Sequence, residues 1–410
     1  MSWLGLEGHE EARERFRRAI VSQRIASTFL FVGPDGVGKR QFALRLAQTL
    51  QCLVNPPAEM NPCGKCESCR LALSGAHPDI LMVSRPAEKA FIPLELLIGS
   101  KVKTQTETTD ADSGETQAIR TSTPGLCLEL SKKPYYGKRK IAIIDDADYL
   151  NLQGANAMLK TLEEPPKNSI LILLGTSLTK QLPTIRSRCQ VIPFQPLSTS
   201  VVEQLLRQIL ATQRLEKATK KKPMLEESMI PQLAAFSEGS VRKALELADP
   251  GLWEFREVFF QELACGRFDR ATIGEKMEKL LEAAGKKAAS GKEAAARRIC
   301  LKNLMEMTAD FYRRLAWYLS GALPADSDTD ARWETLLKEA AEHWKLDAEA
   351  AALAAMRTSD RIELLQRNVH MQTLLEAWME ELLLWQEGDA RLMTVGDWTL
   401  GVKEKLVLSK

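Results

Sequence analysis

A glycine-rich stretch, Gly33 to Arg40, has residue types and a spacing suited to holding phosphate groups. It follows an apolar run, Thr28 to Val32, that predicts a buried strand, and it precedes apolar residues at helical spacing over residues 40–50. A strand, a glycine-rich turn and a helix form the context of a phosphate-binding loop, where backbone N–H groups and the helix N-terminus face the anion. The residues that we expect to contact a nucleotide are Gly33, Gly36, Gly38, Lys39 and Arg40.

Arg40 departs from the usual pattern of such a loop. The position after the lysine normally carries Ser or Thr, because that hydroxyl binds the Mg²⁺ ion that accompanies the phosphates. Arg40 instead brings a positive charge to the place of the divalent cation. The sequence therefore predicts a nucleotide loop whose Mg²⁺ site is impaired, and it leaves open whether ATP binds.

Two adjacent carboxylates, Asp145 and Asp146, end a second apolar run that starts at Lys140. In an open α/β sheet ligands bind at the carboxyl ends of the strands, so we expect both acids to face the glycine-rich loop. Asp145 would hold Mg²⁺, and the next acid, normally Glu, would polarise the attacking water. Asp146 is one methylene shorter than Glu, which retracts its carboxylate by roughly 1.5 Å, and a misplacement of about 1 Å can cost about 100-fold in rate.

Four of the eight cysteines form a metal-binding pattern, with Cys52 followed by Cys63, Cys66 and Cys69 at C-x2-C-x2-C spacing. Four thiolates at such spacing can close a tetrahedral Zn²⁺ site around a segment, residues 52–70, that is too small to fold alone. A redox dithiol and an incidental cluster are the alternatives, but three cysteines within seven residues favour the metal. No neighbouring residues suggest catalysis, so we expect structural zinc.

Length and composition fit a folded chain of two or three domains, with 410 residues of which 45% are hydrophobic. Lys and Arg together number 56 and Asp and Glu 54, so no overall basic field indicates nucleic acid. No apolar run approaches the roughly 18 residues of a membrane span, and the acidic start of the chain does not fit a signal peptide. We therefore expect a cytoplasmic protein that makes no membrane contact.

Strands alternate with helical patterns over residues 1–195, which predicts an α/β fold with a parallel sheet covered on both faces. The further strand candidates are residues 79–84, 169–176 and 189–194. Residues 100–125 are rich in Ser and Thr and poor in apolar residues, so we expect a disordered surface insertion, with a regulatory phosphorylated loop as the alternative. From Ser198 onward the pattern is entirely helical.

Several phrases resemble the bacterial DNA polymerase III clamp-loader subunits of the AAA+ superfamily. That family places a four-cysteine zinc module directly after the first helix of its core, and it carries a Ser-Arg-Cys signature, here Ser187-Arg188-Cys189. The other matching phrases are Ala155–Pro166, which ends in Leu-Glu-Glu-Pro-Pro, and Gly239–Leu245. The resemblance spans residues 1–250, and the remainder matches only in being helical.

The resemblance implies an α/β ATPase core (1–195), a helical lid (196–250) and a helical collar (251–410). Five such subunits, including gamma/tau and delta, would form an open ring that places the sliding clamp on primed DNA. The roles that it implies are Lys39 as Walker A lysine, Asp145 and Asp146 as Walker B acids, Thr176 as sensor 1, Arg242 as sensor 2 and Arg188 as an arginine finger aimed at the neighbour's ATP.

Within that family, gamma/tau subunits keep intact Walker residues, and delta-prime subunits have a decayed nucleotide site. Arg40 and Asp146 indicate the delta-prime type, which scaffolds the ring and lends Arg188 in trans. The complete glycine loop and Arg242 favour the alternative, a gamma/tau-type ATPase motor. The Ser-Arg-Cys and Leu-Glu-Glu-Pro-Pro phrases argue against a chromosomal AAA+ helicase or remodeller. No paired carboxylates for a two-metal polymerase site appear, so any polymerase chemistry would belong to the holoenzyme.

Overall fold

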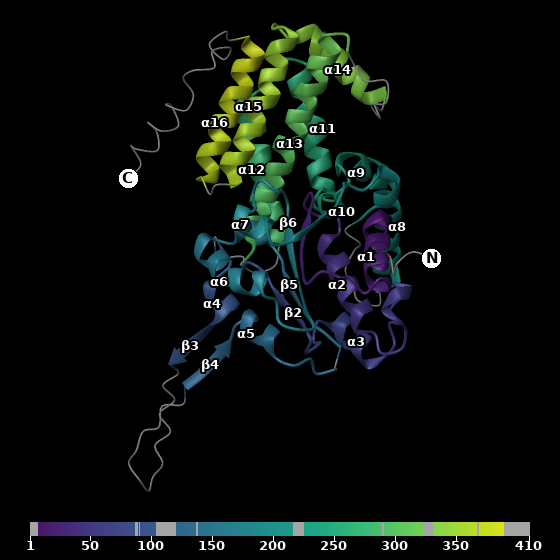
Figure 1. The fold of residues 1–410 in the computed structure, drawn as a ribbon. Helices are drawn as coiled ribbons and strands as arrows, with labels where there is room; N and C mark the ends of the chain where they lie inside the picture. Colours follow the sequence, from purple (N-terminus) through teal and green to yellow (C-terminus); the bar gives the residue numbers. More distant parts are fainter. Residues whose placement is uncertain are drawn as a thin grey trace, which may run out of the picture. The chain divides into compact units, whose positions relative to one another are not determined.

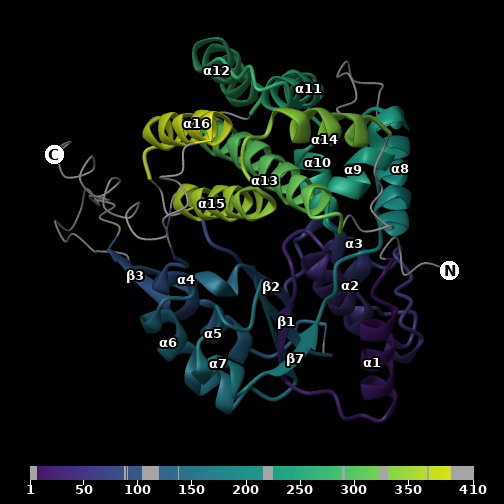
Figure 2. The ribbon, with the colours of Figure 1, turned by 90° about the horizontal axis from the view of Figure 1, so that it is seen from above.

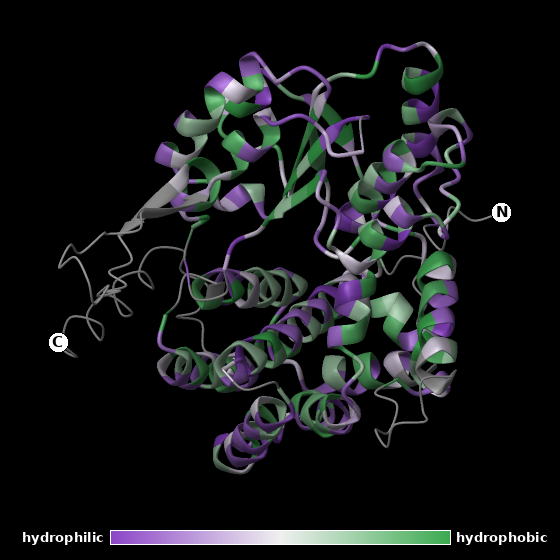
Figure 3. Cartoon of the chain, turned by 90° about the horizontal axis from the view of Figure 1, so that it is seen from below, coloured by the Kyte–Doolittle hydropathy of each residue, from purple (hydrophilic) through white to green (hydrophobic). Residues whose placement is uncertain are grey.

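A five-stranded parallel sheet forms the centre of the N-terminal part of the chain, with strand order β2-β5-β6-β1-β7. The strands are β1 (Thr28–Val32), β2 (Ile80–Val83), β5 (Lys140–Ile144), β6 (Ser169–Gly175) and β7 (Gln190–Pro193). Strands β5 and β6 are buried along their whole length, and Figure 3 shows the sheet coloured mainly as hydrophobic. The predicted α/β fold with a parallel sheet is thereby confirmed.

This computed structural model describes residues 7–86, 89, 91–103, 120–136, 138–215, 225–288, 291–322, 331–366 and 369–388. The chain divides into two compact units, Met1–Leu245 and Glu246–Lys410, and each is described by itself. Among the described residues, no helix combines the length and the apolar character needed to cross a bilayer.

Helices cover both faces of the sheet (Figures 1 and 2). On one face lie α1 (Glu10–Val21) and α2 (Lys39–Gln51), and on the other lie α4 (Leu94–Ile98), α5 (Leu126–Ser131), α6 (Leu152–Glu163) and α7 (Pro183–Arg186). Because side chains alternate along a strand, Phe29 and Phe31 pack on the first face with Phe42 of α2, while Leu30 packs on the second. Side chains on both faces of β1 are therefore packed in the core, and this packing fixes the position of the strand that leads into the glycine-rich loop.

The structure contains a β-hairpin at both ends of residues 100–125, where the sequence predicts a disordered surface insertion. The prediction is therefore wrong for these ends. Strands β3 (Gly99–Lys103) and β4 (Arg120–Pro124) pair antiparallel, with Gly99 opposite Pro124. The composition argument failed here because backbone hydrogen bonds between paired strands do not require apolar side chains. Gly125 follows the hairpin where an added Cβ would lie 2.1 Å from the backbone nitrogen of Gly99. Residues 104–119 lie outside the described part of the chain.

The first unit continues beyond the sheet into helices α8 (Thr199–Leu215) and α9 (Ile230–Phe236), the turn η3 (Glu227–Met229) and most of α10 (Val241–Glu246). Helices α8 and α9 pack against each other, with Val202, Leu206 and Leu233 buried. These helices agree with the helical pattern that the sequence shows from Ser198 onward. Residues 216–224, which include Lys217, Lys220, Lys221 and Lys222, lie outside the described part of the chain.

The described part of the second unit is entirely helical. Its helices are α11 (Pro250–Ala264), α12 (Arg270–Lys287), α13 (Glu293–Leu319), α14 (Ala331–His343), α15 (Ala348–Gln366) and α16 (Met371–Glu387). Tryptophan side chains contribute to the core of this unit: Trp378 and Trp385 are fully buried, and Trp333 is nearly so. Helix α16 also buries Glu381, whose carboxylate lies 3.2 Å from Nε of Arg361 on α15.

Candidate nucleotide and metal sites

The glycine-rich loop joins β1 to α2 and has a backbone that only glycine accommodates at its tightest points. Gly36 and Gly38 have φ of 75° and 102°, in the left-handed region, and Gly38 caps α2. A Cβ on Gly36 would lie 2.2 Å from Oγ of Ser240, and a Cβ on Gly33 would lie 2.1 Å from the carbonyl oxygen of Phe194. The loop therefore lies closely against both the end of β7 and the segment that begins α10.

Lys39 is the first residue of α2 and is buried, with 7% of its surface exposed. Its Nζ donates hydrogen bonds of 2.7 Å to the carbonyl oxygens of Gly33 and Pro34. Burial lowers the pKa of Lys39, and nearby carboxylates, Asp35 foremost, oppose this. An ammonium group has three N–H donors, so one remains for a phosphate oxygen. Glycine loop, helix start and lysine together fit the phosphates of a nucleotide.

Arg40 forms an ion pair with the predicted metal-binding acid. Its Nη1 lies 3.3 Å from Oδ2 of Asp145, which follows β5. The Arg40 side chain is 52% exposed, whereas that of Asp145 is 20% exposed. A Mg²⁺ ion would need this carboxylate and a hydroxyl at position 40, but the carboxylate faces a guanidinium and no hydroxyl is present. The residues present therefore do not fit Mg²⁺ bound in the usual way.

Asp146 has left-handed backbone geometry, with φ of 58°, and precedes the short 3-10 helix η2 (Ala147–Tyr149). Its backbone N–H donates to Oδ1 of Asp145. Burial, and then the charge of Asp145, raise the pKa of Asp146. The structure thus places both predicted acids together at the carboxyl edge of the sheet, the edge from which the glycine-rich loop also leaves.

Asp148 organises this edge, although the sequence analysis assigned it no role. The predicted sensor, Thr176, directly follows β6 and donates to Oδ2 of Asp148 from its backbone N–H (2.9 Å) and its hydroxyl (2.5 Å). The buried Gln181 side chain donates to the other oxygen, Oδ1. Gly175 is needed beside them, because a Cβ there would lie 2.6 Å from Nε2 of Gln181. The position of Asp148, close behind Asp145 and Asp146 after an apolar strand, could have indicated a role for it. No local sequence pattern distinguishes Gln181.

Arg242, the predicted second sensor, lies beside the glycine-rich loop. Its Nη1 is 3.4 Å from Oδ2 of Asp35, and a Cβ on Gly36 would lie 2.5 Å from the Arg242 Cβ. Both partners of the ion pair are mostly exposed, at 61% and 71%, so the pair itself adds little stability. The position of Arg242 nevertheless brings α10 to the loop that would hold the phosphates.

Arg188 lies apart from the other predicted catalytic residues. Its Nε and Nη2 contact Oε1 of Glu163 at 2.7 and 2.5 Å, and its carbonyl oxygen accepts a 2.7 Å hydrogen bond from the Thr28 hydroxyl. Thr28 begins β1, whereas the glycine-rich loop follows the other end of that strand. Five extended residues span roughly 13 Å, so Arg188 lies at the opposite edge of the sheet from its own chain's loop.

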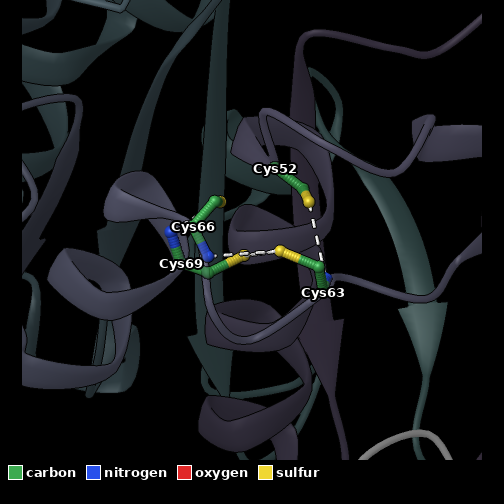
Figure 4. A group of neighbouring side chains, drawn as sticks. All are labelled: Cys52, Cys63, Cys66 and Cys69. Carbon is green, nitrogen blue, oxygen red and sulfur yellow. Dashed lines mark hydrogen bonds between the residues drawn. The ribbon is translucent and has the colours of Figure 1, made fainter.

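The four predicted metal ligands come together, and Figure 4 shows their side chains as one group. The sulfur atoms of Cys52, Cys63, Cys66 and Cys69 all lie within 4.8 Å of one another, and those of Cys63 and Cys69 are 4.0 Å apart. Tetrahedral Zn²⁺ with bonds of about 2.3 Å requires sulfur separations of about 3.8 Å, so modest adjustment would close the site. This donor set fits zinc.

Backbone N–H groups point at the sulfurs, as a cluster of thiolates requires. Sγ of Cys63 accepts from the N–H of Cys66 at 3.3 Å, and Sγ of Cys66 accepts from the N–H of Cys69 at 3.4 Å at the start of α3 (Glu67–Ser74). The N–H groups of Cys66 and Lys65 lower the pKa of Cys63, whereas burial raises that of Cys69. A thiolate is the form that binds the metal.

Ser68 and His77 connect the cysteine module to the sheet. Ser68 is fully buried between two of the cysteines, and its hydroxyl donates to the carbonyl oxygen of Gln51 at 2.8 Å. The same hydroxyl lies 3.0 Å from Nε2 of His77, whose Nδ1 accepts from the N–H of Asp79 just before β2. These bonds fit a neutral ring protonated at Nε2, and burial lowers the pKa of His77 accordingly.

The part of the chain that carries these sites is similar to known proteins. The family model described as DNA polymerase III, delta subunit, matches residues 8–198, and a relative from Bacillus subtilis, DNA polymerase III subunit delta', is 32% identical over 188 residues. Over this part, the chain is similar to bacterial DNA polymerase III clamp-loader subunits, and it spans about half the length of the Bacillus relative. The four-cysteine module, the glycine-rich loop and Arg188 all lie within the matched residues 8–198.

Two further relatives show that the chain is similar to both delta' and tau/gamma subunits. Subunit delta' of Pseudomonas aeruginosa is 29% identical over 238 residues, and subunit tau/gamma of Haemophilus influenzae is 28% identical over 246 residues. The alignments cover 46%, 56% and 60% of this chain, and 48%, 58% and 30% of the Bacillus, Pseudomonas and Haemophilus proteins. Since identity to the two kinds of subunit is nearly equal, the chemistry of the site has to distinguish them.

Proposed function

We propose that this chain is a delta-prime-type subunit that scaffolds the clamp-loader ring and does not hydrolyse ATP. The observation that carries the proposal is the Arg40–Asp145 ion pair, which places a guanidinium on the carboxylate that Mg²⁺ would need. The aspartate at position 146, one methylene shorter than the usual glutamate, is a second and independent departure. Without a metal ion to position the phosphates and without a correctly placed acid, the attacking water is not activated.

The proposed partners are gamma/tau and delta subunits in a pentameric ring, which loads the sliding clamp on primed DNA. In this arrangement residues 1–195 form the AAA+ core, residues 196–250 the lid and residues 251–410 the collar that joins subunits. The zinc that the four cysteines would hold is structural. The position of Arg188 supports the proposal, because Arg188 is separated from its own glycine-rich loop by the length of β1, roughly 13 Å, and would act on a neighbour's nucleotide instead of its own.

A gamma/tau-type motor is the second candidate. It is favoured by the complete glycine loop, by the buried Lys39 and by the nearly equal identity to a tau/gamma subunit. The two candidates differ in one measurable property, which is Mg²⁺-dependent ATP hydrolysis by the chain's own site.

We expect the purified protein to hydrolyse ATP in the presence of Mg²⁺ no faster than its Lys39→Ala variant. Restoring both catalytic positions, with Arg40→Thr and Asp146→Glu together, should produce turnover above that baseline, because the loop and Lys39 are already formed. The measurement is phosphate release from ATP at steady state.

Arg207→Thr serves as the matched control for this assay. Arg207 lies on α8, is 57% exposed and is ion-paired with Glu203, so it resembles Arg40 in exposure and in having a carboxylate partner, but it does not belong to the glycine-rich loop or to α2. Its replacement should leave the rate at baseline. Robust hydrolysis by the unmodified protein, abolished by Lys39→Ala, would establish the motor instead.

A further inference from the structure

We propose that the glycine-rich loop binds a nucleoside di- or triphosphate without a divalent cation, with the Arg40 guanidinium in the cation's place. The inference rests on the proposed function in one respect: both use the loss of the Mg²⁺ site. The altered site would then have a ligand, the phosphates of a nucleotide, and a mode of binding that uses no metal ion. The starting observation is that Arg40 and Asp145 do not fit a bound Mg²⁺ ion.

The loop keeps what binds phosphate and changes only what binds the metal. Gly36 and Gly38 hold the left-handed geometry that exposes backbone N–H groups, and α2 begins directly behind them. Lys39 is held in the loop with one donor to spare. Two glycines in left-handed geometry and a lysine with a spare N–H donor are what binding of a phosphate group requires. These features are explained if phosphate still binds.

Arg40 can perform the electrostatic part of the cation's task. It stands at the position whose side chain normally reaches the metal, and 52% of the side chain is exposed. A guanidinium has five N–H donors in a planar fork that matches phosphate oxygens, and the contact with Asp145 engages Nη1. The remaining donors can bridge phosphate oxygens as Mg²⁺ does, with a charge that no physiological pH removes.

Asp145 then acts as the positioning residue for Arg40. Its carboxylate is only 20% exposed and directly follows β5, which is buried on both faces, so it is a rigid anchor. Without a partner, a long arginine side chain samples many rotamers, and ordering it costs free energy on binding. The ion pair pre-organises the guanidinium at the carboxyl edge of the sheet, where the loop also lies. A divalent cation would be repelled by the same guanidinium.

The test is isothermal titration of the full-length protein with ADP and with ATP, in Mg²⁺ and in EDTA at equal ionic strength. We expect binding with the same Kd in both buffers. Lys39→Ala should abolish binding in both, which identifies the loop as the site, and Arg207→Thr should bind as the unmodified protein does.

Two variants separate the arginine mode from a metal mode. Arg40→Thr should bind about tenfold or more weakly in EDTA, the worth of a charge-assisted hydrogen bond, and should regain affinity when Mg²⁺ is added. Asp145→Asn should weaken binding to the same extent in EDTA and in Mg²⁺, because it removes the carboxylate that pre-organises the guanidinium, whereas a metal mode requires that this variant lose affinity only in Mg²⁺. Thermal unfolding of each variant shows that it is folded.

Binding that needs Mg²⁺, or no nucleotide binding in either buffer, would overturn the proposal. The second result would leave the non-hydrolysing scaffold intact, since a scaffold needs no ligand of its own. Mg²⁺-dependent binding accompanied by hydrolysis would instead overturn both proposals. The two failures are thus distinguishable.

Discussion

Replacing Arg188 by alanine should leave the protein folded and able to assemble, yet stop the assembled ring from loading clamps. An arginine finger contributes roughly 10³–10⁵ in rate at the nucleotide that it serves, because a planar, permanently charged group stabilises the charge that develops on the transferred phosphoryl group. Arg188 and Glu163 are 32% and 50% exposed, so losing their ion pair should cost about 0–1 kcal/mol of stability. The expected effect on loading therefore greatly exceeds the effect on folding.

The measurement uses a ring reconstituted from unmodified motor subunits and either form of this chain. DNA-stimulated ATP hydrolysis should fall by the share of the one interface that Arg188 serves, and clamp loading should fall with it. Arg188→Lys tests the geometry, because it keeps the charge and loses the planar fork. Arg186→Ala is the matched control, since Arg186 is an exposed arginine at the end of the adjacent helix α7. Unmodified loading rates with Arg188→Ala would make Arg188 an ordinary surface residue.

The sequence predicted the sheet well because the sheet is encoded locally. After a polar first residue, each of the strands β1, β5 and β6 continues as an apolar run, as is typical of strands buried on both faces. The C-x2-C-x2-C spacing is equally local, and it predicted the cysteine cluster that the structure contains. The hairpin of β3 and β4 was missed because its stability comes from backbone pairing, which leaves no apolar signature in the sequence.

The partners of the site residues were not predictable in the same way. Arg40 and Asp145 are 105 positions apart, and Thr176 and Asp148 are 28 apart, so each contact depends on strand order rather than on spacing. The sequence showed that position 40 carried the wrong residue for Mg²⁺. Only the three-dimensional arrangement shows that Arg40 is paired with Asp145, the predicted metal-binding acid. The guanidinium therefore brings a positive charge to the carboxylate that would otherwise bind Mg²⁺.

Removal of zinc should strongly destabilise the folded protein. We expect one Zn²⁺ per chain and its loss in Cys66→Ser, with a marked fall in the melting temperature. Between Cys52 and Cys69 the module buries little apolar surface besides Met60, and Leu53 and Val54 are 45% and 68% exposed. A segment with so small a core depends on its metal, and structural zinc contributes about 10–16 kcal/mol of apparent binding energy in small zinc-finger peptides.

Metal analysis and thermal unfolding of the full chain, before and after chelation, measure both effects. A ligand that binds only the folded form stabilises it by mass action, so a chelator should lower the melting temperature of the unmodified protein to that of Cys66→Ser and leave the variant unchanged. Cys265→Ser is the control. Cys265 lies in the other unit, so the protein that carries this substitution should retain its zinc. Burial raises the pKa of Cys189 and Cys300 to about 12, so neither thiol is available as a thiolate. Protein without zinc, or full zinc retention by Cys66→Ser, would contradict the four-cysteine site.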